Sequence, residues 1–504
     1  MTPSDVTHMA GASRPFSRMR SAMAGEHGAG LIDSLLLIGA RVGTNLLVLV
    51  WTLILVRLLT PDLSGIAFAG IAVAQIASMF LTLNVEAVSM RVLVPAMREG
   101  RLEVAAGFIR FNRRILLLAL PPVAIAAWAW QALHGGHGSV MLTLAVTVAM
   151  VMAAMARITG RHATALGVMR KGILPRMLAG PVVMTCGLVA AWLFGLTLRP
   201  WHVVGLYALS EALTVAIQNR LLRADFAPFA GLSGDASGWR EWVGLGLWLA
   251  PGSLMNEFRK AVLIAAAGLA LAPAKVSLFA VALSIINIMN FGVSAVDVAF
   301  SQRLSRTLTG DEPRMRDRFL AVSGAIKLAG YTLGMALVAA FGWWALGWFG
   351  PGYRAAWPAL LMLTLIPGLT ILLGPGSVIL STCGLGREDF AANVIGAALT
   401  VLAVAGCSAL GGLTGAAVGA VIGCTASQGS TKTVYVPAAT FSITRRERYV
   451  DESSGSSSLH QLRIDESRMN TTYANTIRTS TTQDEVVLDF GINLPVPGQD
   501  NQPV

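Results

Sequence analysis

Long apolar stretches recur along most of this chain, and each is long enough to cross a membrane. They begin at Leu31 and continue to around Ser427, in runs of about 20 residues that match a hydrocarbon core of ~30 Å. Lipid offers no partner for an exposed backbone N–H group, so a segment there must be a helix or part of a closed barrel. The runs lack the alternation of barrel strands. The sequence therefore predicts an all-α polytopic membrane protein.

Composition agrees with this prediction. Hydrophobic residues make up 54% of the chain and charged residues 13%, whereas a soluble domain carries roughly a quarter charged residues. We expect about twelve spans, at residues 31–56, 65–87, 115–133, 139–158, 178–197, 202–218, 243–271, 276–300, 320–347, 358–381, 391–410 and 412–427.

The basic residues indicate how the chain is oriented in the membrane. The net charge is +11, and Lys and Arg number 23 in one set of alternate loops against four in the other. The positive-inside rule then places the N-terminus in the cytoplasm. Residues 1–30 show no cleavage-site pattern, so the first apolar run is expected to be a retained span. This distribution explains the basic charge without a nucleic-acid partner.

Few features point to catalysis or to a cofactor. The four cysteines lie scattered in apolar stretches without C-x-x-C spacing, and no metal site is expected. No Walker-type phosphate-binding motif occurs, so the chain is not expected to be an ATPase. The predicted outer loops have at most about a dozen residues. They leave little room for the outer catalytic groups of a glycan polymerase or ligase, so an enzyme is not expected.

Polar side chains gather on single faces of four expected helices, the first two of each half. At 100° per residue, helical wheels align Ser34, Arg41, Thr44, Asn45 and Thr52 in the first span, Gln75, Ser78, Thr82 and Glu86 in the second, Ser253, Asn256, Glu257 and Lys260 in the seventh with Arg259 on its flank, and Asn287, Asn290, Ser294, Asp297 and Ser301 in the eighth. The third to sixth spans carry far less, with Glu211 as the main exception.

Two interpretations of these stripes stay open. The Ser, Thr and Asn residues fit hydrogen bonds that hold helices together. The charged residues fit a hydrated pathway better, because a charge at mid-bilayer costs about 2.5–3.5 kcal/mol on insertion scales. Lys327, near the start of the ninth span, either joins that pathway or extends to the membrane interface.

A faint internal repeat suggests a duplication of six helices. The segment Thr60-Pro61-Asp62-Leu63-Ser64 precedes the second span, and Ala272-Pro273-Ala274-Lys275-Val276-Ser277 precedes the eighth. Transporters are commonly built from such repeats, with the binding site between the halves.

The residues after the first span resemble a known family. The run from Val56 to Gly65 resembles the A-R-x-L-x-P-x-x-Y-G turn of polysaccharide exporters, the O-antigen and teichoic-acid flippase-like members of the multidrug/oligosaccharidyl-lipid/polysaccharide (MOP) superfamily. Ser64 stands where that family often has an aromatic residue. Further matches are 272–306, 349–353 and 384–387, so the resemblance covers about residues 25–427.

This resemblance implies a fold and a function. It implies two six-helix bundles around a central cleft, alternating access, and outward transport of polyprenyl-diphosphate-linked oligosaccharide across the bacterial inner membrane. The cations expected to meet the diphosphate are Arg41, Arg259, Lys260 and Lys327, and the amides expected to bond sugar hydroxyls are Asn45, Asn256 and Asn287. The carboxylates Glu86, Glu211, Glu257 and Asp297 are expected either to pair with these cations or to bind a coupling ion.

Other functions and partners stay in view. The alternatives are a cation-coupled drug or metabolite antiporter of the same superfamily and an integral-membrane glycan-assembly protein without transport activity. Membrane lipids are expected partners, together with glycosyltransferases and a polysaccharide polymerase.

The C-terminal tail differs in composition from the rest of the chain. After Ser427 the sequence becomes polar, and 431–436 is expected to be a strand. Residues 462–494 resemble the start of a small bacterial β-rich domain of unknown function, which indicates a fused fragment. The expected organisation is a cytoplasmic segment (1–30), a first bundle (31–218), a linker (219–242), a second bundle (243–427) and a β-rich or disordered tail (428–504).

Overall fold

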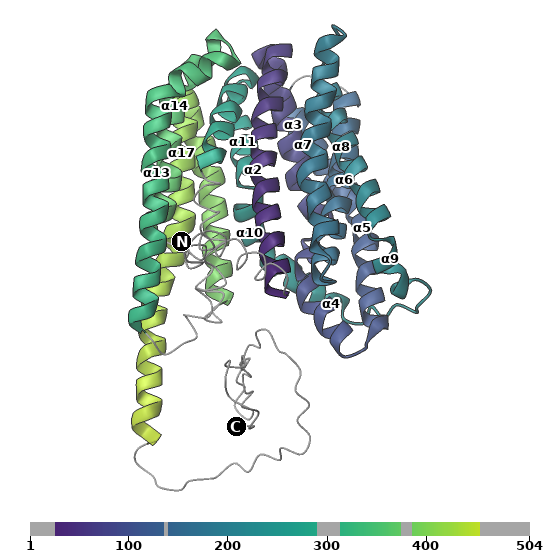
Figure 1. Cartoon of the computed structure of the whole chain (residues 1–504). Helices are drawn as coiled ribbons and strands as arrows, with labels where there is room; N and C mark the ends of the chain where they lie inside the picture. Colours follow the sequence, from purple (N-terminus) through teal and green to yellow (C-terminus); the bar gives the residue numbers. More distant parts are fainter. Residues whose placement is uncertain (1–25, 136–139, 290–312, 374–385, 454–504) are drawn as a thin grey trace, which may run out of the picture. The chain divides into compact units, whose positions relative to one another are not determined.

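The computed structural model describes residues 26–135, 140–289, 313–373 and 386–453, and every regular element in these ranges is a helix (Figure 1). The first half of the chain contains α2 (Glu26–Leu58), α3 (Pro61–Leu81), η1 (Val85–Val88), α4 (Ser89–Arg98), α5 (Leu102–Gly135), α6 (Val140–Ala165), α7 (Met169–Leu193) and α8 (Pro200–Leu221). After α9 (Arg223–Phe226) and η2 (Ala227–Phe229), the second half contains α10 (Trp239–Glu257), α11 (Arg259–Gly268), the Pro273–Met289 helix, α13 (Pro313–Phe349), η3 (Pro351–Ala356), α14 (Trp357–Leu363), α15 (Leu365–Leu373) and α17 (Gly386–Ser453).

Eight helical stretches of the described part are long and apolar enough to cross a membrane. One of them, Asp389–Ser427, contains the last two expected spans, because its backbone breaks at Gly412 (φ 58°). The three remaining expected spans correspond to α8, to α10 followed by α11, and to the Pro273–Met289 helix. The prediction of an all-α polytopic membrane protein is confirmed.

The second span ends earlier than its apolar sequence indicates. It was expected to continue to residue 87, but α3 ends at Leu81 and the backbone turns left-handed at Leu83 (φ 47°) and Asn84 (φ 57°). Asn tolerates this conformation better than most residues. The Asn84 N–H donates to the Met79 carbonyl at 3.2 Å and also to the Thr82 hydroxyl at 3.2 Å, so the turn keeps this donor satisfied. Because the helix breaks before Glu86, one helical wheel does not describe Glu86 together with Gln75 and Ser78.

The two segments of the internal repeat lie against each other. The Ala274 N–H donates to Asp62 Oδ1 at 3.2 Å, and the hydroxyls of Ser64 and Ser277 are 2.7 Å apart. The Tyr353 hydroxyl completes the cluster, 2.8 Å from Ser277 Oγ. Contacts between corresponding segments are what a two-fold relation between repeats produces near its axis. We call Ser64, Ser277 and Tyr353 the hydroxyl cluster.

The start of the tail differs from its prediction. Residues 431–436 are helical, because α17 continues to Ser453, so the expected strand is wrong. Adding residues to an existing helix needs no new nucleus, and each β-branched residue then costs only tenths of a kcal/mol. The expected β-rich fragment at 462–494 lies outside the described residues.

Candidate functional site

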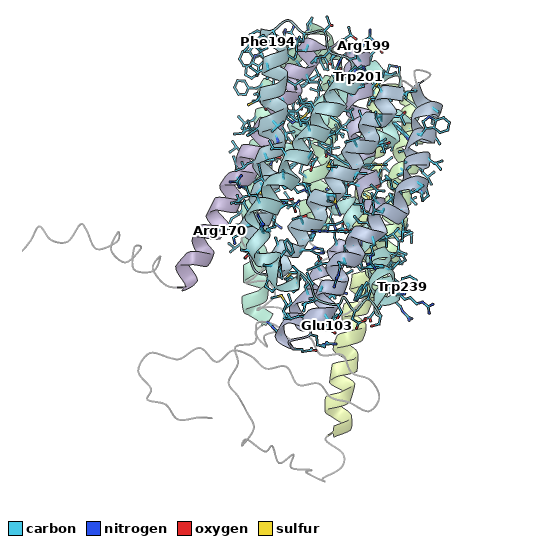
Figure 2. All side chains as sticks on the ribbon, turned by 90° about the vertical axis from the view of Figure 1, so that its right-hand side faces the viewer. Glu103, Arg170, Phe194, Arg199, Trp201 and Trp239 are labelled. Atoms are coloured by element: carbon cyan, nitrogen blue, oxygen red, sulfur yellow. The ribbon has the colours of Figure 1, made fainter. Side chains whose placement is uncertain are left out.

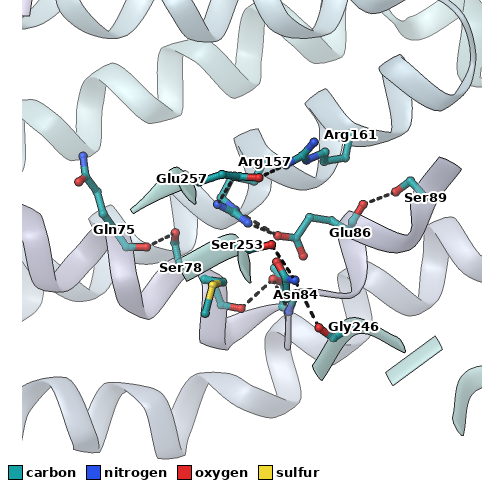
Figure 3. A network of polar contacts seen from close by, with 12 residues as sticks. Gln75, Ser78, Asn84, Glu86, Ser89, Arg157, Arg161, Gly246, Ser253 and Glu257 are labelled. Atoms are coloured by element: carbon teal, nitrogen blue, oxygen red, sulfur yellow. Dashed lines mark hydrogen bonds and ion pairs between the residues drawn. The ribbon is translucent and has the colours of Figure 1, made fainter. Parts of the chain in front are cut away.

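A buried ion pair lies between α6 and η1 (Figure 3). Arg157 Nε donates a 3.1 Å hydrogen bond to Glu86 Oε1, and Arg157 Nη2 donates to the same oxygen. The side chains are 2% and 0% exposed. Removing a charge from water is costly unless a partner of opposite sign is bound. Each of these residues therefore depends on the other for its burial.

Glu257 connects this pair to the second half of the chain. It is the last residue of α10, and its Oε2 accepts a 3.2 Å hydrogen bond from Arg157 Nη1. Its Oε1 accepts a hydrogen bond from Arg161, one turn further along α6. We call Glu86, Arg157, Arg161 and Glu257 the charge quartet. It holds two cations and two carboxylates, so it is electrically neutral when all four are charged.

Neutral contacts flank the charge quartet. Asn84 Nδ2 donates to Ser253 Oγ at 3.1 Å and to the Gly246 carbonyl at 3.3 Å, both on α10 (Figure 3). A side chain at position 246 would meet the Leu83 carbonyl oxygen at 2.7 Å, so glycine permits this close approach. The turn after α3 and the middle of α10 are thereby held together.

A second polar cluster lies deeper in the first half. Gln75 Nε2 donates to the Tyr207 hydroxyl at 3.5 Å, and Tyr207 stands one turn before Glu211 on α8. Arg176 of α7 lies close enough to both Glu211 and Arg157 to interact electrostatically. Glu211 is 9% exposed, and its Oε2 has no hydrogen-bond partner among the described residues. With Arg176 and Glu211 included, three cations of the first half lie among three carboxylates, of which Glu257 belongs to the second half.

A line of polar contacts joins α11, the Pro273–Met289 helix and α2. Lys260 Nζ donates to Ser284 Oγ at 2.8 Å. One turn further, Asn287 Nδ2 donates to Asn45 Oδ1 at 3.1 Å. Arg41 lies one turn from Asn45 on α2 and is exposed. These contacts bring together three predicted site residues from both halves of the chain, Lys260, Asn45 and Asn287.

The seventh span does not form the single polar stripe expected of it. The helix is interrupted at Phe258, between α10 and α11, so one wheel does not describe both parts. Ser253 and Glu257 contact the first half, whereas Lys260 contacts the Pro273–Met289 helix. Arg259 Nε donates back across the interruption to the Met255 carbonyl of α10, 3.2 Å away.

The other predicted site residues are dispersed. Asn256 is exposed next to Glu257, and Lys327 lies half-buried on α13. Asp297 lies outside the described residues.

Sequence reasoning missed the cations of the first half. Arg161 and Arg176 lie between the expected fourth span (139–158) and fifth span (178–197), and Arg157, at the very end of the fourth span, is counted with the basic residues of the loop that follows it. The structure places all three in helices, since α6 continues to Ala165 and α7 begins at Met169. The spacing of Arg157 and Arg161, four residues apart at the end of an apolar helix, is the signal that indicates a shared face.

Comparisons with known proteins bear on the fold. No protein-family model matches this chain, and no curated protein matches it. The structure is similar to that of an inward-facing multidrug resistance MATE family transporter of the MOP superfamily, at 13% sequence identity and a TM-score of 0.58, over 80% of this chain and 98% of that one. Weaker likenesses are to another MATE structure (14% identity, TM-score 0.48, 80% and 94% covered) and to a MOP superfamily transporter from Pyrococcus furiosus (14%, 0.47, 79% and 92%). The first of these likenesses shows that the chain has the same fold as that inward-facing transporter.

Proposed function

We propose that this protein is an alternating-access transporter that carries a lipid-linked oligosaccharide, attached through a diphosphate, across the bacterial inner membrane. The transporter part of the proposal is supported by the fold, by the interior charges and by polar contacts that join the two halves. The substrate part is supported by the sequence resemblance and by the distribution of cations described next.

The substrate assignment is supported by the difference between the cations that have carboxylate partners and those that have none. Arg157 and Arg161 pair with Glu86 and Glu257, whereas Arg259 and Lys260 form no ion pair within the described part of the chain. Two adjacent cations inside a membrane protein favour an anionic ligand, and charge-assisted hydrogen bonds to phosphate are strong. Asn45 and Asn287, in the same line of contacts, would bond sugar hydroxyls.

The membrane potential would supply part of the driving force. Two negative charges that move outward against an inside-negative potential gain about 2.3 kcal/mol per charge per 100 mV. With the N-terminus in the cytoplasm, the outward direction agrees with the expected export of a surface-polysaccharide precursor. Glycosyltransferases and a polymerase would then act before and after transport.

The test is transport in proteoliposomes. A fluorescent polyprenyl-diphosphate sugar should cross the bilayer with the wild-type protein, and Arg259→Ala/Lys260→Ala should abolish its transport. The matched control is Arg98→Ala/Arg101→Ala, which removes the same charge from two exposed residues and should transport normally. Wild-type protein that is folded and moves no such lipid, or equal loss in both double variants, would refute the substrate assignment.

A second candidate, a cation-coupled antiporter, is favoured by the interior carboxylates. Glu86 and Glu211 each have one buried oxygen without a hydrogen-bond partner among the described residues. Such an oxygen is suited to coordinate a coupling ion. An antiporter should move a cationic dye in exchange for protons, and Glu211→Gln should abolish this transport. A flippase should not transport the dye. The same proteoliposomes distinguish the two.

A further inference from the structure

Helix α7 contains a proline at its centre. Arg170, near the start of this helix, and Phe194, which follows its last residue, lie far apart along the bundle (Figure 2), and Pro181 is the central residue between Met169 and Leu193. Proline has no backbone N–H group, so it cannot form the helical hydrogen bond to the carbonyl four residues earlier. The Met177 carbonyl has therefore lost its helical donor, at a depth where lipid offers no replacement.

A threonine of α2 supplies a donor for this carbonyl. Thr44 Oγ1 donates to the Met177 carbonyl at 2.6 Å, and the Ala40 carbonyl, one turn earlier on α2, lies 2.8 Å from the same hydroxyl. A hydroxyl has one proton, so the two carbonyls compete for it. The Ala40 carbonyl can also accept from the Thr44 N–H of its own helix, whereas Pro181 deprives the Met177 carbonyl of the corresponding donor. The competition therefore favours the contact between α2 and α7.

Thr44 and the residue after it hold α2 on two sides. Helix α2 packs against α7 (Figure 1), and Thr44 forms its hydrogen bond on that side. Asn45 accepts the 3.1 Å hydrogen bond from Asn287 in the second half of the chain. Successive side chains differ by 100° around a helix, so a rotation or shift of α2 that breaks the Thr44 contact also moves Asn45. The position of Asn45 in the line of polar contacts therefore depends on Thr44.

We propose that Thr44 is a positioning residue for transport, and that its hydrogen bond to the carbonyl freed by Pro181 fixes α2 on α7 and so places Asn45 at Asn287. When the halves part, the Asn45–Asn287 contact should break, because water can replace a hydrogen bond between two amides at little net cost. The contact between Thr44 and Met177 should persist, because α7 has no N–H group to return to that carbonyl. The effect on transport rests on the proposed function, whereas the anchoring of α2 does not.

The first experiment measures the position of α2 without any substrate. In the full-length, cysteine-free protein in proteoliposomes, Asn45→Cys/Asn287→Cys should crosslink readily. Thr44→Val keeps the shape of the side chain but removes its donor, and should slow crosslinking about fivefold, as expected for one lost hydrogen bond. Thr44→Ser keeps the hydroxyl and should stay within about twofold of the parent. The matched control is Thr52→Val, because Thr52 donates within α2, to the Val48 carbonyl at 2.6 Å.

Substitution of Pro181 tests whether its missing N–H group is the cause. Pro181→Ala gives α7 its own donor for the Met177 carbonyl, so it should slow crosslinking about as much as Thr44→Val does. Adding Thr44→Val to Pro181→Ala should change the rate by less than about twofold, because both substitutions remove the same contact. Alanine favours a helix interior, so Pro181→Ala is expected to fold.

Transport of the fluorescent polyprenyl-diphosphate sugar is the second readout. Thr44→Val should raise KM about fivefold and leave the maximal rate within about twofold, whereas a loss of folded protein would lower the maximal rate alone. An unchanged KM alongside slowed crosslinking would refute the role of Thr44 in transport.

Three crosslinking results would overturn the anchor itself. They are an unchanged rate in Thr44→Val, equal slowing in Thr44→Ser and Thr44→Val, and independent effects of Thr44→Val and Pro181→Ala. If crosslinking follows the expectations in a protein that moves no such lipid, the anchor stands and the proposed substrate is refuted.

Discussion

Arg157 donates a 3.2 Å hydrogen bond to Glu257, although 100 positions separate the two residues in the chain. Arg157 belongs to the interior of the first half, where only 2% of its side chain is exposed, while Glu257 ends the first helix of the second half. The Arg157 guanidinium therefore contacts a carboxylate of each half, namely Glu86 within the first half and Glu257 of the second.

The burial of Glu86 makes Arg157 necessary for folding. Arg157→Met should destabilise the protein by about 3–5 kcal/mol, because it leaves Glu86 buried without a partner. The double variant Arg157→Met/Glu86→Met should regain most of this loss, since no unpaired buried charge remains. Arg101→Met, which removes an exposed pair with Glu99, should change stability by less than about 1 kcal/mol. Denaturant unfolding in detergent measures all three, and a double variant as unstable as the single one would contradict the expectation.

Glu257 should control how firmly the turn after α3 contacts α10. Glu257→Gln removes the charged contact to Arg157 and Arg161 but keeps the size of the side chain. In a cysteine-free background, a cysteine pair at positions 84 and 253, where the side chains now meet at 3.1 Å, should then crosslink several-fold more slowly. Glu99→Gln at the surface serves as the control. Equal crosslinking rates in the two variants would show that the quartet does not hold this contact.

Gly65 lies where a larger residue has no room. A Cβ atom at this position would overlap the Pro273 carbonyl oxygen, whereas one at Gly43 would meet nothing within 4 Å. Gly65→Ala should therefore lower the melting temperature and loosen the contact between the two repeat segments. Gly43→Ala, also inside a helix, should be neutral or stabilising by about 0.5–1 kcal/mol. Thermal unfolding of the pair distinguishes this steric effect from a general effect of alanine.

Asn45 and Asn287 should act as one unit. Their amides share a 3.1 Å hydrogen bond, so single alanine substitutions should each impair the transport step, and the double variant should be little worse than either. A double-mutant cycle should give a coupling of about 0.5–1.5 kcal/mol. The reference cycle pairs Asn45 with Thr332, whose hydroxyl donates to the Ala329 carbonyl of its own helix, and should be additive. Additivity in the Asn45–Asn287 cycle would contradict the proposed shared role.

Apolar run length was enough to predict the helices, because lipid excludes other backbone structures. Helix ends were harder to predict. The turn at Leu83 and Asn84 lies inside an apolar run and depends on contacts with α10, more than 160 positions away. The strand expected at 431–436 failed for a related reason, since local β propensity was weaker than continuation of α17.

The interior charges show a sharper limit of sequence reasoning. Glu86 and Glu257 were singled out because they interrupt apolar runs, but their shared partner Arg157 looked like an ordinary basic loop residue. The positive-inside rule assigns basic residues to loops on one side of the membrane. It therefore cannot identify an arginine that is buried in an ion pair with a carboxylate of a different helix. Lys260, Asn45 and Asn287 were predicted as polar site residues, and nothing in the sequence indicated that Lys260 contacts Ser284 while Asn287 of the same helix contacts Asn45.

The hydroxyl cluster has a consequence for the kinetics of any rocking motion. Parting Ser64 from Ser277 and Tyr353 exposes neutral groups, and water replaces such hydrogen bonds at little net cost. Parting Glu257 from Arg157 and Arg161 separates opposite charges, two of which are already partly in contact with solvent, so dissolved ions would screen them. In an alternating-access cycle, the step that parts the hydroxyl cluster would then have a rate independent of ionic strength. The step that parts Glu257 from the two arginines would be faster at higher salt concentration.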